Sequence, residues 1–403
     1  MRLALRLARR GYGTTSPNPT VGAVLVKGGK IIGRGRTAPV GGPHAEIEAL
    51  RDAQKHARNP KGATLYVTLE PCCTHGRTPP CTDAIIAAGI KRVIVGAIDP
   101  NPKHAGRGFK ILRRAGIAVI HPGAAPFGVP RLRGPDRLKA ELQTKLAGDC
   151  ARLNEAFNHW IVRRTPFVTV KAAMTLDGKI ATASGESKWI TGEKARAYGM
   201  KLRQGRDAIL VGINTILADD PSLTARANTN PGNIQHSTFN IQHPILRRVV
   251  LDSMARTPLK ARVVSDEFAA LTTIVVTKQA PKNRLDALGK SVNVLVAPTV
   301  RNPPLVARHP PLIDLDWLLK KLGAENVTSL LVEGGGEVNA SFLLGGFAHR
   351  VAFFYASKIL GGRDSRKGVA GDGVKSLSEV IQLREVEWRK LGADLLLTAR
   401  VAA

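Results

Sequence analysis

Short apolar runs of strand character alternate with helical patterns along two stretches of this chain, and this alternation restricts the possible folds more than any other feature. Between Pro19 and Val119, the runs VGAVLV, KIIGRG, ATLYVTL and RVIVGAI are short, rich in β-branched residues and bounded by Gly or Pro. The segments HAEIEALRDAQKHA and CTDAIIAAGI have helical spacing and separate these runs. The pattern predicts an α/β layer whose sheet is largely parallel after a first hairpin.

A second α/β stretch follows a segment of different character. Residues 122–150 contain three prolines by Pro130 and then a polar helical pattern. Beyond them, the strand candidates are FVTVKAAMTLDG, AILVG, RRVVLD, LTTIVVT, VNVLVA, SLLVEGG and RVAFFYA. Because 403 residues exceed what one core usually organises, we expect a first domain at 1–121, a linker at 122–164 and a second domain at 165–403. Residues 227–244 are polar and rich in Asn and Gln, which indicates a surface insertion.

Composition excludes several classes of protein. A hydrophobic fraction of 43% with 23% charged residues is ordinary for a globular chain and excludes wholesale disorder and fibrous repeats. No run approaches the roughly 20 apolar residues that span a bilayer. Four cysteines are too few for a disulfide framework, which favours a reducing, cytoplasmic location. The opening MRLALRLARRGYG predicts a first helix of the domain, with a transit peptide as the alternative.

The net charge of +29 is the unusual number. Residues 1–145 contribute 25 basic and 8 acidic side chains to it. Such a field attracts nucleic acid, phosphorylated metabolites or anionic lipid, but it also arises from a proteome-wide basic bias. No block of five like charges occurs, which favours the general bias.

One constellation in the first stretch has the composition of a catalytic metal site. His44 precedes a helix, Cys72 follows a strand, and Cys81 opens a second helix. One imidazole and two thiolates are three ligands for Zn²⁺, and they leave the fourth tetrahedral position for water. Helix N-termini favour thiolate over thiol. Glu46, two residues after His44, is placed to carry a proton from that water to a leaving amine.

The arrangement matches half of the H-x-E…P-C-x-x-C signature of zinc nucleobase deaminases, because eight residues rather than two separate the cysteines. Cys73 is a rival ligand beside Cys72. We choose Cys72 because it comes immediately after Pro71, and the side chain of its neighbour along the chain should then point elsewhere. Cys150 lies in the linker and is expected to be a bystander. His75 either contacts substrate or occupies a turn.

Several segments of both stretches resemble those of a known family. TTSPNPTVGAVLV, GGPHAEIEAL, YVTLEPCCTHGRTPPCTDAII and DPNPKHAGRG resemble the deaminase half of the bifunctional riboflavin-biosynthesis deaminase–reductases, which share the longer cysteine gap. KAAMTLDGKIATASGESKWIT, LADDPSLTAR and LLVEGGGEVNASFL resemble the reductase half. The resemblance covers nearly the whole chain except the linker and the insertion. It implies an α/β fold with an N-terminal cytidine-deaminase-like three-layer domain and a C-terminal dihydrofolate-reductase-like domain.

The resemblance also implies an activity. Such an enzyme deaminates 2,5-diamino-6-(5-phosphoribosylamino)pyrimidin-4-one with zinc and then reduces the ribosyl side chain to ribityl phosphate with NADPH. His44, Cys72 and Cys81 would hold zinc, Glu46 would be the catalytic proton shuttle, and Asn18 would contact the base and sugar. Members of the family commonly form homo-oligomers.

The second stretch contains a weaker constellation. No G-x-G-x-x-G follows a strand, but SLLVE runs into three glycines and then a helical segment. Such a turn either lets an anion approach the backbone N–H groups at the helix N-terminus, or is only a tight turn without a ligand. By resemblance, the cofactor contacts are Ala173, Trp189, Thr215, Asp219, Ser253, Gly335, Gly336, Glu337, Val338, Asn339, Ala340 and Ser341. The substrate contacts implied in the same way are Ser187, Arg203, Leu223, Arg226 and Glu333.

The residue types agree with this chemistry. Arg203 and Arg226 offer bidentate donors to a ribose phosphate. Trp189 is either a flat ring beside the cofactor or plain core packing. The cofactor carries the hydride, but the ribosyl oxygen still needs a proton donor. Lys171 and Asp177 are both candidates, and Asp177 is also a turn residue.

Two other functions compete with this hypothesis. A nucleic-acid (tRNA-type) zinc deaminase with a basic accessory domain would use the positive charge of the first third. Against it, aromatic residues are 4% of the chain, and residues 1–120 hold only Tyr12, Tyr66 and Phe109 for base stacking. A binding protein that senses NADPH is the third possibility. We therefore expect an enzyme acting on a small phosphorylated pyrimidine, without a membrane or nucleic-acid partner.

Overall fold

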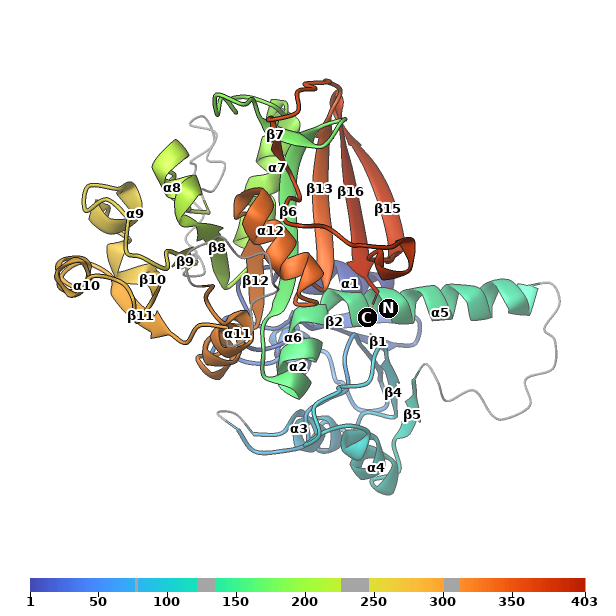
Figure 1. Ribbon diagram of the computed structural model, residues 1–403. Helices are drawn as coiled ribbons and strands as arrows, with labels where there is room; N and C mark the ends of the chain where they lie inside the picture. The colour runs from blue at the N-terminus through green and yellow to red at the C-terminus, as the bar shows by residue number, and fades with distance from the viewer. Residues whose placement is uncertain (77–78, 122–134, 226–245, 301–311, 403) are drawn as a thin grey trace, which may run out of the picture. The chain divides into compact units, whose positions relative to one another are not determined.

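The chain divides into two compact units, Met1–Arg164 and Thr165–Ala403. The computed structural model describes residues 1–76, 79–121, 135–225, 246–300 and 312–402 (Figure 1). The described part of the predicted linker carries helices α5 (Pro135–Leu153) and α6 (Glu155–Arg163), which both group with the first unit. The predicted insertion and Arg226 lie outside the described residues.

The first unit is built on a five-stranded sheet of order β2-β1-β3-β4-β5. Its strands are β1 (Gly22–Lys27), β2 (Lys30–Arg36), β3 (Thr64–Val67), β4 (Arg92–Val95) and β5 (Ala118–Ile120). Its other helices are α1 (Arg2–Arg9), α2 (Ala45–Lys55), α3 (Cys81–Ala87) and α4 (Arg107–Arg114). β1 pairs antiparallel with β2 and β3, whereas β3, β4 and β5 are parallel. The predicted first helix, hairpin and parallel remainder are confirmed.

Glycines allow two helices to lie unusually close to opposite faces of this sheet. A Cβ on Gly35 of β2 would come 2.0 Å from the Ala45 carbonyl oxygen, at the start of α2. A Cβ on Gly22 of β1 would come 2.0 Å from the Ala4 carbonyl oxygen of α1. Gly35 pairs with Ala23, so Gly22 faces the other way and the two helices cover opposite faces. The first unit therefore has three layers, and α2 is held tightly in place.

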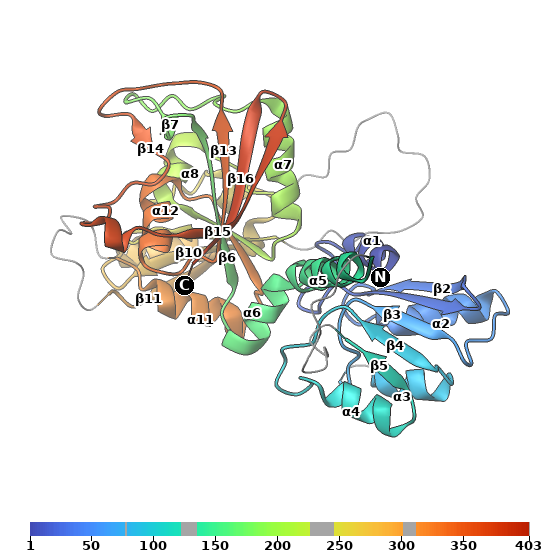
Figure 2. The same ribbon diagram turned by 90° about the vertical axis from the view of Figure 1, so that its right-hand side faces the viewer.

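The second unit contains a nine-stranded sheet of order β11-β10-β9-β8-β12-β6-β13-β16-β15 (Figures 1 and 2). These strands are β6 (Phe167–Thr175), β8 (Ala208–Gly212), β9 (Arg247–Leu251), β10 (Thr272–Thr277), β11 (Asn293–Ala297), β12 (Ser329–Val332), β13 (Arg350–Ala356), β15 (Leu383–Leu391) and β16 (Asp394–Val401). In the sheet order, the seven strands from β11 to β13 are parallel to one another. β16 pairs antiparallel with β13, and β15 pairs antiparallel with β16. A separate pair is formed by β7 (Lys179–Ala181) and β14 (Arg366–Lys367).

Helices cover both faces of the parallel strands, which explains why those strands are continuous apolar runs in the sequence. The helices of this unit are α7 (Glu193–Gln204), α8 (Ile213–Asp219), α9 (Arg262–Ser265), α10 (Lys282–Leu288), α11 (Leu315–Ala324) and α12 (Gly335–Leu344), with short 3₁₀ turns at Ala269–Leu271 and Leu377–Glu379. α11 and α12 pack on one face with Leu210 and Val332, and α8, α9 and α10 pack on the other with Ile209 and Val211. Every residue of β8 and β10 is buried. No helix in the described part of the chain has both the length and the apolar character needed to cross a bilayer.

The C-terminal strands β15 and β16 have no counterpart among the predicted strands. β15 lies at the sheet edge and is exposed along almost its whole length. Its alternation is broken by an irregular register between Arg384 and Glu387, where Glu385 has a φ of 51°. An exposed, irregular edge strand lacks the periodic apolar signal from which strands are predicted.

Candidate functional site

Three side chains of the first unit converge as a candidate metal centre. The Nδ1 atom of His44 lies 3.3 Å from the Sγ atom of Cys81 and 3.4 Å from the Sγ atom of Cys72. All three ligand atoms lie within 4.8 Å of one another. Tetrahedral zinc, with its usual bond lengths to sulfur and nitrogen, separates such ligands by about 3.6 Å. The donor set therefore fits Zn²⁺ in both chemistry and spacing.

Local structure explains how the three ligands meet. His44 is the N-cap residue of α2, and Cys81 is the first residue of α3. Cys72 follows β3 after a short extended segment, and its Sγ atom accepts a hydrogen bond from the backbone N–H of Cys81 at 3.3 Å. The two predicted helix starts are confirmed. Two helix N-termini thus direct their positive ends at this cluster.

The electrostatics of the cluster favour one thiolate before any metal is considered. Hydrogen bonding from the Cys81 thiol, together with that from His44, lowers the pKa of Cys72 to about 4 despite burial. The hydrogen bond to Cys72 raises the pKa of His44, and the same neighbour raises the pKa of the Cys81 thiol. One ligand is therefore already charged at neutral pH, and a cation in the cluster would ionise the second thiol.

Glu46 lies in the first turn of α2 beside these ligands. Its side chain is buried, with 4% of the residue exposed. Burial, and then the nearby Cys72 thiolate, raise the pKa of Glu46 to about 7. A carboxyl group with that pKa accepts and returns a proton near neutral pH, which is what a proton shuttle requires.

A buried carboxylate holds the loop behind the metal cluster. Glu70, two residues before Cys72, accepts hydrogen bonds from the backbone N–H groups of Asp99, Gly106 and Gly108 at 3.3, 3.0 and 3.1 Å. This joins the DPNPKHAGRG segment to the strand end that carries Cys72. No short motif predicts this role for Glu70, because its partners lie 29 to 38 residues away.

The other candidates of the first unit are not among the three clustered ligands. The Sγ atom of Cys73 lies 3.5 Å from Nδ1 of His104, so Cys73 faces away from the three ligands, as expected. His75 is exposed. Asn18 is half-buried, and its backbone N–H donates to Thr15 within the same loop. Cys150 is no linker residue, because it is fully buried in the core of the first unit against Gly96.

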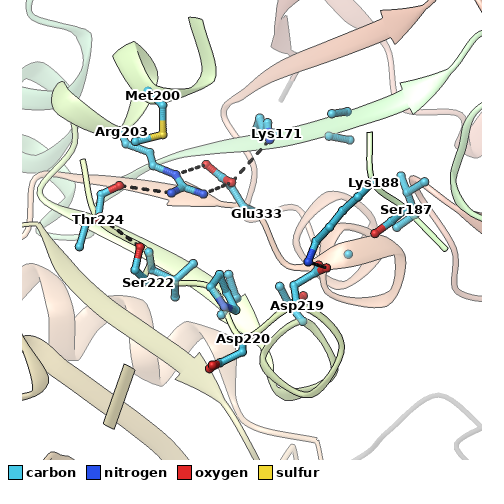
Figure 3. Close-up of a pocket in the computed structure, with 18 of the residues that line it drawn as sticks. Lys171, Ser187, Lys188, Met200, Arg203, Asp219, Asp220, Ser222, Thr224 and Glu333 are labelled. Atoms are coloured by element: carbon cyan, nitrogen blue, oxygen red, sulfur yellow. Dashed lines mark hydrogen bonds and ion pairs between the residues drawn. The ribbon is translucent and has the colours of Figure 1, made fainter. Parts of the chain in front are cut away.

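The second unit holds a cavity of about 650 Å³ at the carboxyl ends of its parallel strands, the usual ligand position in such sheets. Figure 3 shows Arg203, Lys171 and Glu333 meeting on one wall. The Glu333 carboxylate accepts from Nε and Nη2 of Arg203 at 3.0 and 2.8 Å, and Nζ of Lys171 lies 3.5 Å from its Oε2 atom. On the opposite side, Lys188 pairs with Asp219 at 3.4 Å.

This cluster is charged and buried at once. Burial alone would raise the pKa of Glu333, but the charges of Arg203 and Lys171 lower it to about 2. One carboxylate therefore faces two cations, and the cluster keeps a net positive charge. That surplus suits a phosphorylated substrate.

A second cavity of about 790 Å³ adjoins the first, and five residues line both. The shared wall consists of Ile180, Ser187, Thr215, Asp219 and Gly335. The second cavity runs past the N-terminus of α12 to the loop after β9. The glycine turn between β12 and α12, predicted from the sequence, is confirmed.

Most of the predicted reductase residues line one of the two cavities. The first cavity includes Ala173, Ser187, Trp189, Arg203, Thr215, Asp219, Leu223, Glu333, Gly335 and Asn339. The second includes Ser253, Gly336, Glu337, Val338 and Ser341. Ala340 differs, because it is 3% exposed and packs towards Gly371. Among the predicted cofactor and substrate contacts of this unit that the structure describes, Ala340 is the one that lines neither cavity.

The positions of Trp189, Asp177 and Lys171 bear on two alternatives that the sequence left open: whether Trp189 is a core residue, and which residue donates the proton. Trp189 is 66% exposed and lies under the guanidinium of Arg196, so it is not core packing. Asp177 holds a turn by accepting from the backbone N–H groups of Leu360 and Gly361. Lys171, by contrast, lines the first cavity.

Sequence reasoning missed several polar residues of the second cavity. Asn214, Arg256, Arg366 and Lys367 all line it. Arg256 follows Ser253 in the same loop. Its position shortly after the end of a predicted strand is the signal from which a cavity residue could have been inferred. Arg366 and Lys367 form β14, which had no recognisable pattern.

Comparison with known proteins gives this two-site chain a family. Residues 1–97 match the family model for the cytidine and deoxycytidylate deaminase zinc-binding region, and residues 166–397 match that for the RibD C-terminal domain. The riboflavin biosynthesis protein RibD of Aquifex aeolicus is 41% identical over 98% of this chain and 96% of its own length. That of Actinobacillus pleuropneumoniae is 40% identical over 98% of this chain and 93% of its own. The chain belongs to the RibD family.

Solved structures of RibD proteins agree with this assignment. Acinetobacter baumannii RibD superimposes with a TM-score of 0.77 at 32% identity, covering all of this chain and 98% of that one. A Thermotoga maritima protein described as a diaminohydroxyphosphoribosylaminopyrimidine deaminase/5-amino-6-(5-phosphoribosylamino)uracil reductase gives 0.74 at 33% identity, covering 100% and 97%. The predicted two-domain fold and bifunctional enzyme class are therefore confirmed. This RibD-family chain is a riboflavin-biosynthesis enzyme with a zinc-binding deaminase domain and a reductase domain that uses a nicotinamide cofactor.

Proposed function

We propose that the chain deaminates 2,5-diamino-6-(5-phosphoribosylamino)pyrimidin-4-one in residues 1–121 and reduces the product's ribosyl group to ribityl phosphate in residues 165–403. The observation that carries this proposal is the presence, on one chain, of the His44–Cys72–Cys81 cluster with buried Glu46 and of a separate cationic cavity at the ends of the parallel strands. The Thermotoga maritima relative is described as having the same two activities.

In the deaminase half, the residues divide into ligands and a proton carrier. His44, Cys72 and Cys81 would hold zinc, which would supply the Lewis acidity that lets water attack at neutral pH. Glu46 takes the proton from the attacking water and returns it to the departing amine, so ammonia leaves as a neutral molecule. Asn18 is assigned to the base and sugar.

In the reductase half, this chain's residues bind and orient the two reactants. NADPH supplies the hydride. Arg203 presents its positive charge to the first cavity, and Ser187 and Leu223 of the same lining are assigned to the substrate with it. Arg226, which lies outside the described residues, is assigned to the substrate by its place in the LADDPSLTAR motif alone. Glu333 keeps Arg203 and Lys171 in place. Lys171 delivers the proton to the ribosyl oxygen, since Asp177 is engaged in a turn.

The cofactor contacts assigned to this half begin in the first cavity and extend along the second. Ala173, Trp189, Thr215 and Asp219 would hold the nicotinamide and its ribose, and Ser253 lies at the other end of the second cavity. The phosphates meet the turn and helix from Gly335 to Ser341. The buried Ala340 supports this helix from behind rather than touching the cofactor.

Assembly, location and partners complete the proposal. The chain forms a homo-oligomer, which is supported by exposed apolar side chains on the end strands: Val386, Trp388 and Leu395 are 48, 59 and 40% exposed. It acts in the cytoplasm, where its four unpaired cysteines stay reduced. We assign it no nucleic-acid partner, because residues 1–120 offer only Tyr12, Tyr66 and Phe109 for base stacking.

The decisive experiment follows both reactions in one cuvette. Purified full-length protein, NADPH and the phosphoribosylated diaminopyrimidinone are mixed while ammonia release and the absorbance of NADPH are recorded together. We expect ammonia first and NADPH oxidation after it. Ammonia without oxidation would remove the reductase assignment. Neither signal from zinc-loaded, folded protein would overturn the proposal and favour a screen of RNA substrates.

A further inference from the structure

The loop after β9 presents one cation to the far end of the second cavity, and neither motif nor resemblance assigned it a role. Arg256 is exposed, lines this cavity, and donates from Nη2 to Oδ1 of Asn214 at 3.1 Å. Its partner is therefore a neutral amide. Arg256 takes part in none of the ion pairs found among the described residues. A guanidinium that is oriented but not neutralised is prepared for an anionic ligand.

The backbone on either side of Arg256 is fixed. Oδ2 of the fully buried Asp252 accepts from both the N–H and the hydroxyl of Thr257 at 2.7 Å. Nε of Arg284 donates to the carbonyl oxygen of Ala255 at 3.0 Å, and Ala255 itself has a φ of 54°. A loop held at the residues just before and after Arg256 is a built feature of the cavity, because an irregular backbone with φ above zero persists only where its surroundings determine it.

The order of the sheet sets which part of a dinucleotide would reach this loop. The wall shared by the two cavities, next to Lys171 and Glu333, is the place where the nicotinamide can meet substrate. The glycine turn after β12 lines the second cavity at the N-terminus of α12 and would hold the pyrophosphate there. β9 lies beyond β8 on the side of β12 away from β6, so the loop after β9 is left for the adenosine half.

The other cations of the cavity belong to a different part of it. The Lys367 carbonyl oxygen lies 2.3 Å from where a Cβ of Gly336 would be, which places β14 over the glycine turn. The Arg366 guanidinium lies 3.5 Å from the corresponding position of Gly185. These two residues therefore accompany the pyrophosphate and the loop before Ser187, and Arg256 is the cation at the adenosine end among the lining residues that the structure describes.

A dinucleotide enzyme distinguishes its cofactors at the adenosine ribose. A carboxylate there accepts from the free 2′-hydroxyl of NADH, whereas an arginine accommodates the 2′-phosphate of NADPH. The one carboxylate of the 252–257 loop is that of Asp252, and it is turned inward to Thr257. We propose that Arg256, held by Asn214, binds the 2′-phosphate and makes the reductase half selective for NADPH over NADH. This inference rests on the proposed reductase function.

The test compares ligands that differ only in the 2′-phosphate. Isothermal titration calorimetry on the full-length chain measures NADP⁺ against NAD⁺ and adenosine 2′,5′-bisphosphate against 5′-AMP. The wild type should prefer the 2′-phosphorylated member of each pair. Arg256→Gln should weaken binding of those members about 10- to 100-fold, the range for a charge-assisted hydrogen bond, and leave NAD⁺ and 5′-AMP unchanged. Arg256→Lys should keep part of the preference, and Lys290→Gln, which removes an exposed charge of the same unit away from the cavity, should keep all of it.

The outcomes separate this inference from the function on which it rests. If Arg256→Gln weakens both members of a pair equally, or neither, Arg256 does not recognise the 2′-phosphate and the inference is wrong while the reductase assignment stands. A wild type that binds NAD⁺ as tightly as NADP⁺ also refutes it. A wild type that binds neither dinucleotide refutes the reductase function itself, and the inference with it.

Discussion

Replacement of Glu333 by Gln tests whether the charged cluster of the first cavity is held together as the structure indicates. Glu333 accepts two hydrogen bonds from Arg203 and faces Lys171, and the side chains of all three residues are at most 20% exposed. Gln keeps the shape but removes the charge, so Arg203 and Lys171 are left close together without a counter-ion. Removing one partner of a buried pair costs about 3–5 kcal/mol.

The pKa of Glu333 leads to a similar free energy for the loss of its charge. It falls from an ordinary 4.5 to about 2 in the folded chain, and each pKa unit corresponds to about 1.4 kcal/mol. The ionised carboxylate thus stabilises the folded unit by about 3 kcal/mol. Because the folded pKa is depressed, this contribution is complete above pH 5 and is lost as the pH falls towards 2. By the same linkage it should have declined to about 2 kcal/mol at pH 3.5.

Urea unfolding of the full-length chain, followed by tryptophan fluorescence, measures the difference. Glu333→Gln should lower the free energy of unfolding of the second unit by about 3 kcal/mol between pH 5 and 7, and by less at pH 3.5. Asp316→Asn is the matched control, because Asp316 pairs with Lys320 on the surface of α11 and should change stability by less than about 0.5 kcal/mol. A Glu333→Gln protein within 1 kcal/mol of wild type at pH 7, or a difference that does not change with pH, would refute this reasoning.

Three further predictions concern the first unit. Glu46→Gln should retain zinc, measured by elemental analysis, and lower ammonia release by about 10²- to 10⁴-fold, while reduction of supplied deaminated substrate is unaffected. A zinc chelator should abolish ammonia release but not NADPH oxidation with that substrate, and added zinc should restore the loss; persistence of deamination in metal-free protein would contradict the ligand assignment. Gly35→Ala should displace α2, because its Cβ would meet the Ala45 carbonyl oxygen, and should impair deamination together with the stability of the first unit. Gly148→Ala, with open space around its Cβ in α5, is the control and should be neutral or slightly stabilising in thermal unfolding.

The metal cluster was predictable from the sequence because short-range signals determine it. Pro43 and the helical pattern after it place His44 at a helix N-terminus, and Cys81 likewise opens a helix after two prolines. Only the distance between the two segments needed tertiary structure. What the sequence did not show is the support for the cluster, such as Glu70, whose role is defined by backbone N–H groups that have no sequence signature.

The edges of the second unit were predicted least well, for a related reason. β15 and β16 lie where one face of the sheet carries exposed apolar side chains, so neither a continuous buried run nor a clean alternation marks β15. The linker at 122–164 was inferred from its prolines and polar residues, but α6 buries Phe157 and Trp160, and Asn154 bonds back to Thr20. Packing against a distant surface overrode local composition there.

The first site was easier to predict from the sequence than the second, and the order of their elements along the chain explains why. The ligands of the first site come from elements that follow one another along the chain, namely α2, the end of β3, and α3. The second site gathers the carboxyl ends of β6, β12, β8 and β9, which neighbour one another in an order that differs from their order in the chain. Arg203 and Glu333 are 130 residues apart, so residue type alone cannot show that they form a pair. The same crossing connections bring the loop of Arg256 to the far end of the second cavity, which adjoins the cavity of Lys171. An arginine that no sequence motif marks thereby becomes a candidate for selecting the cofactor.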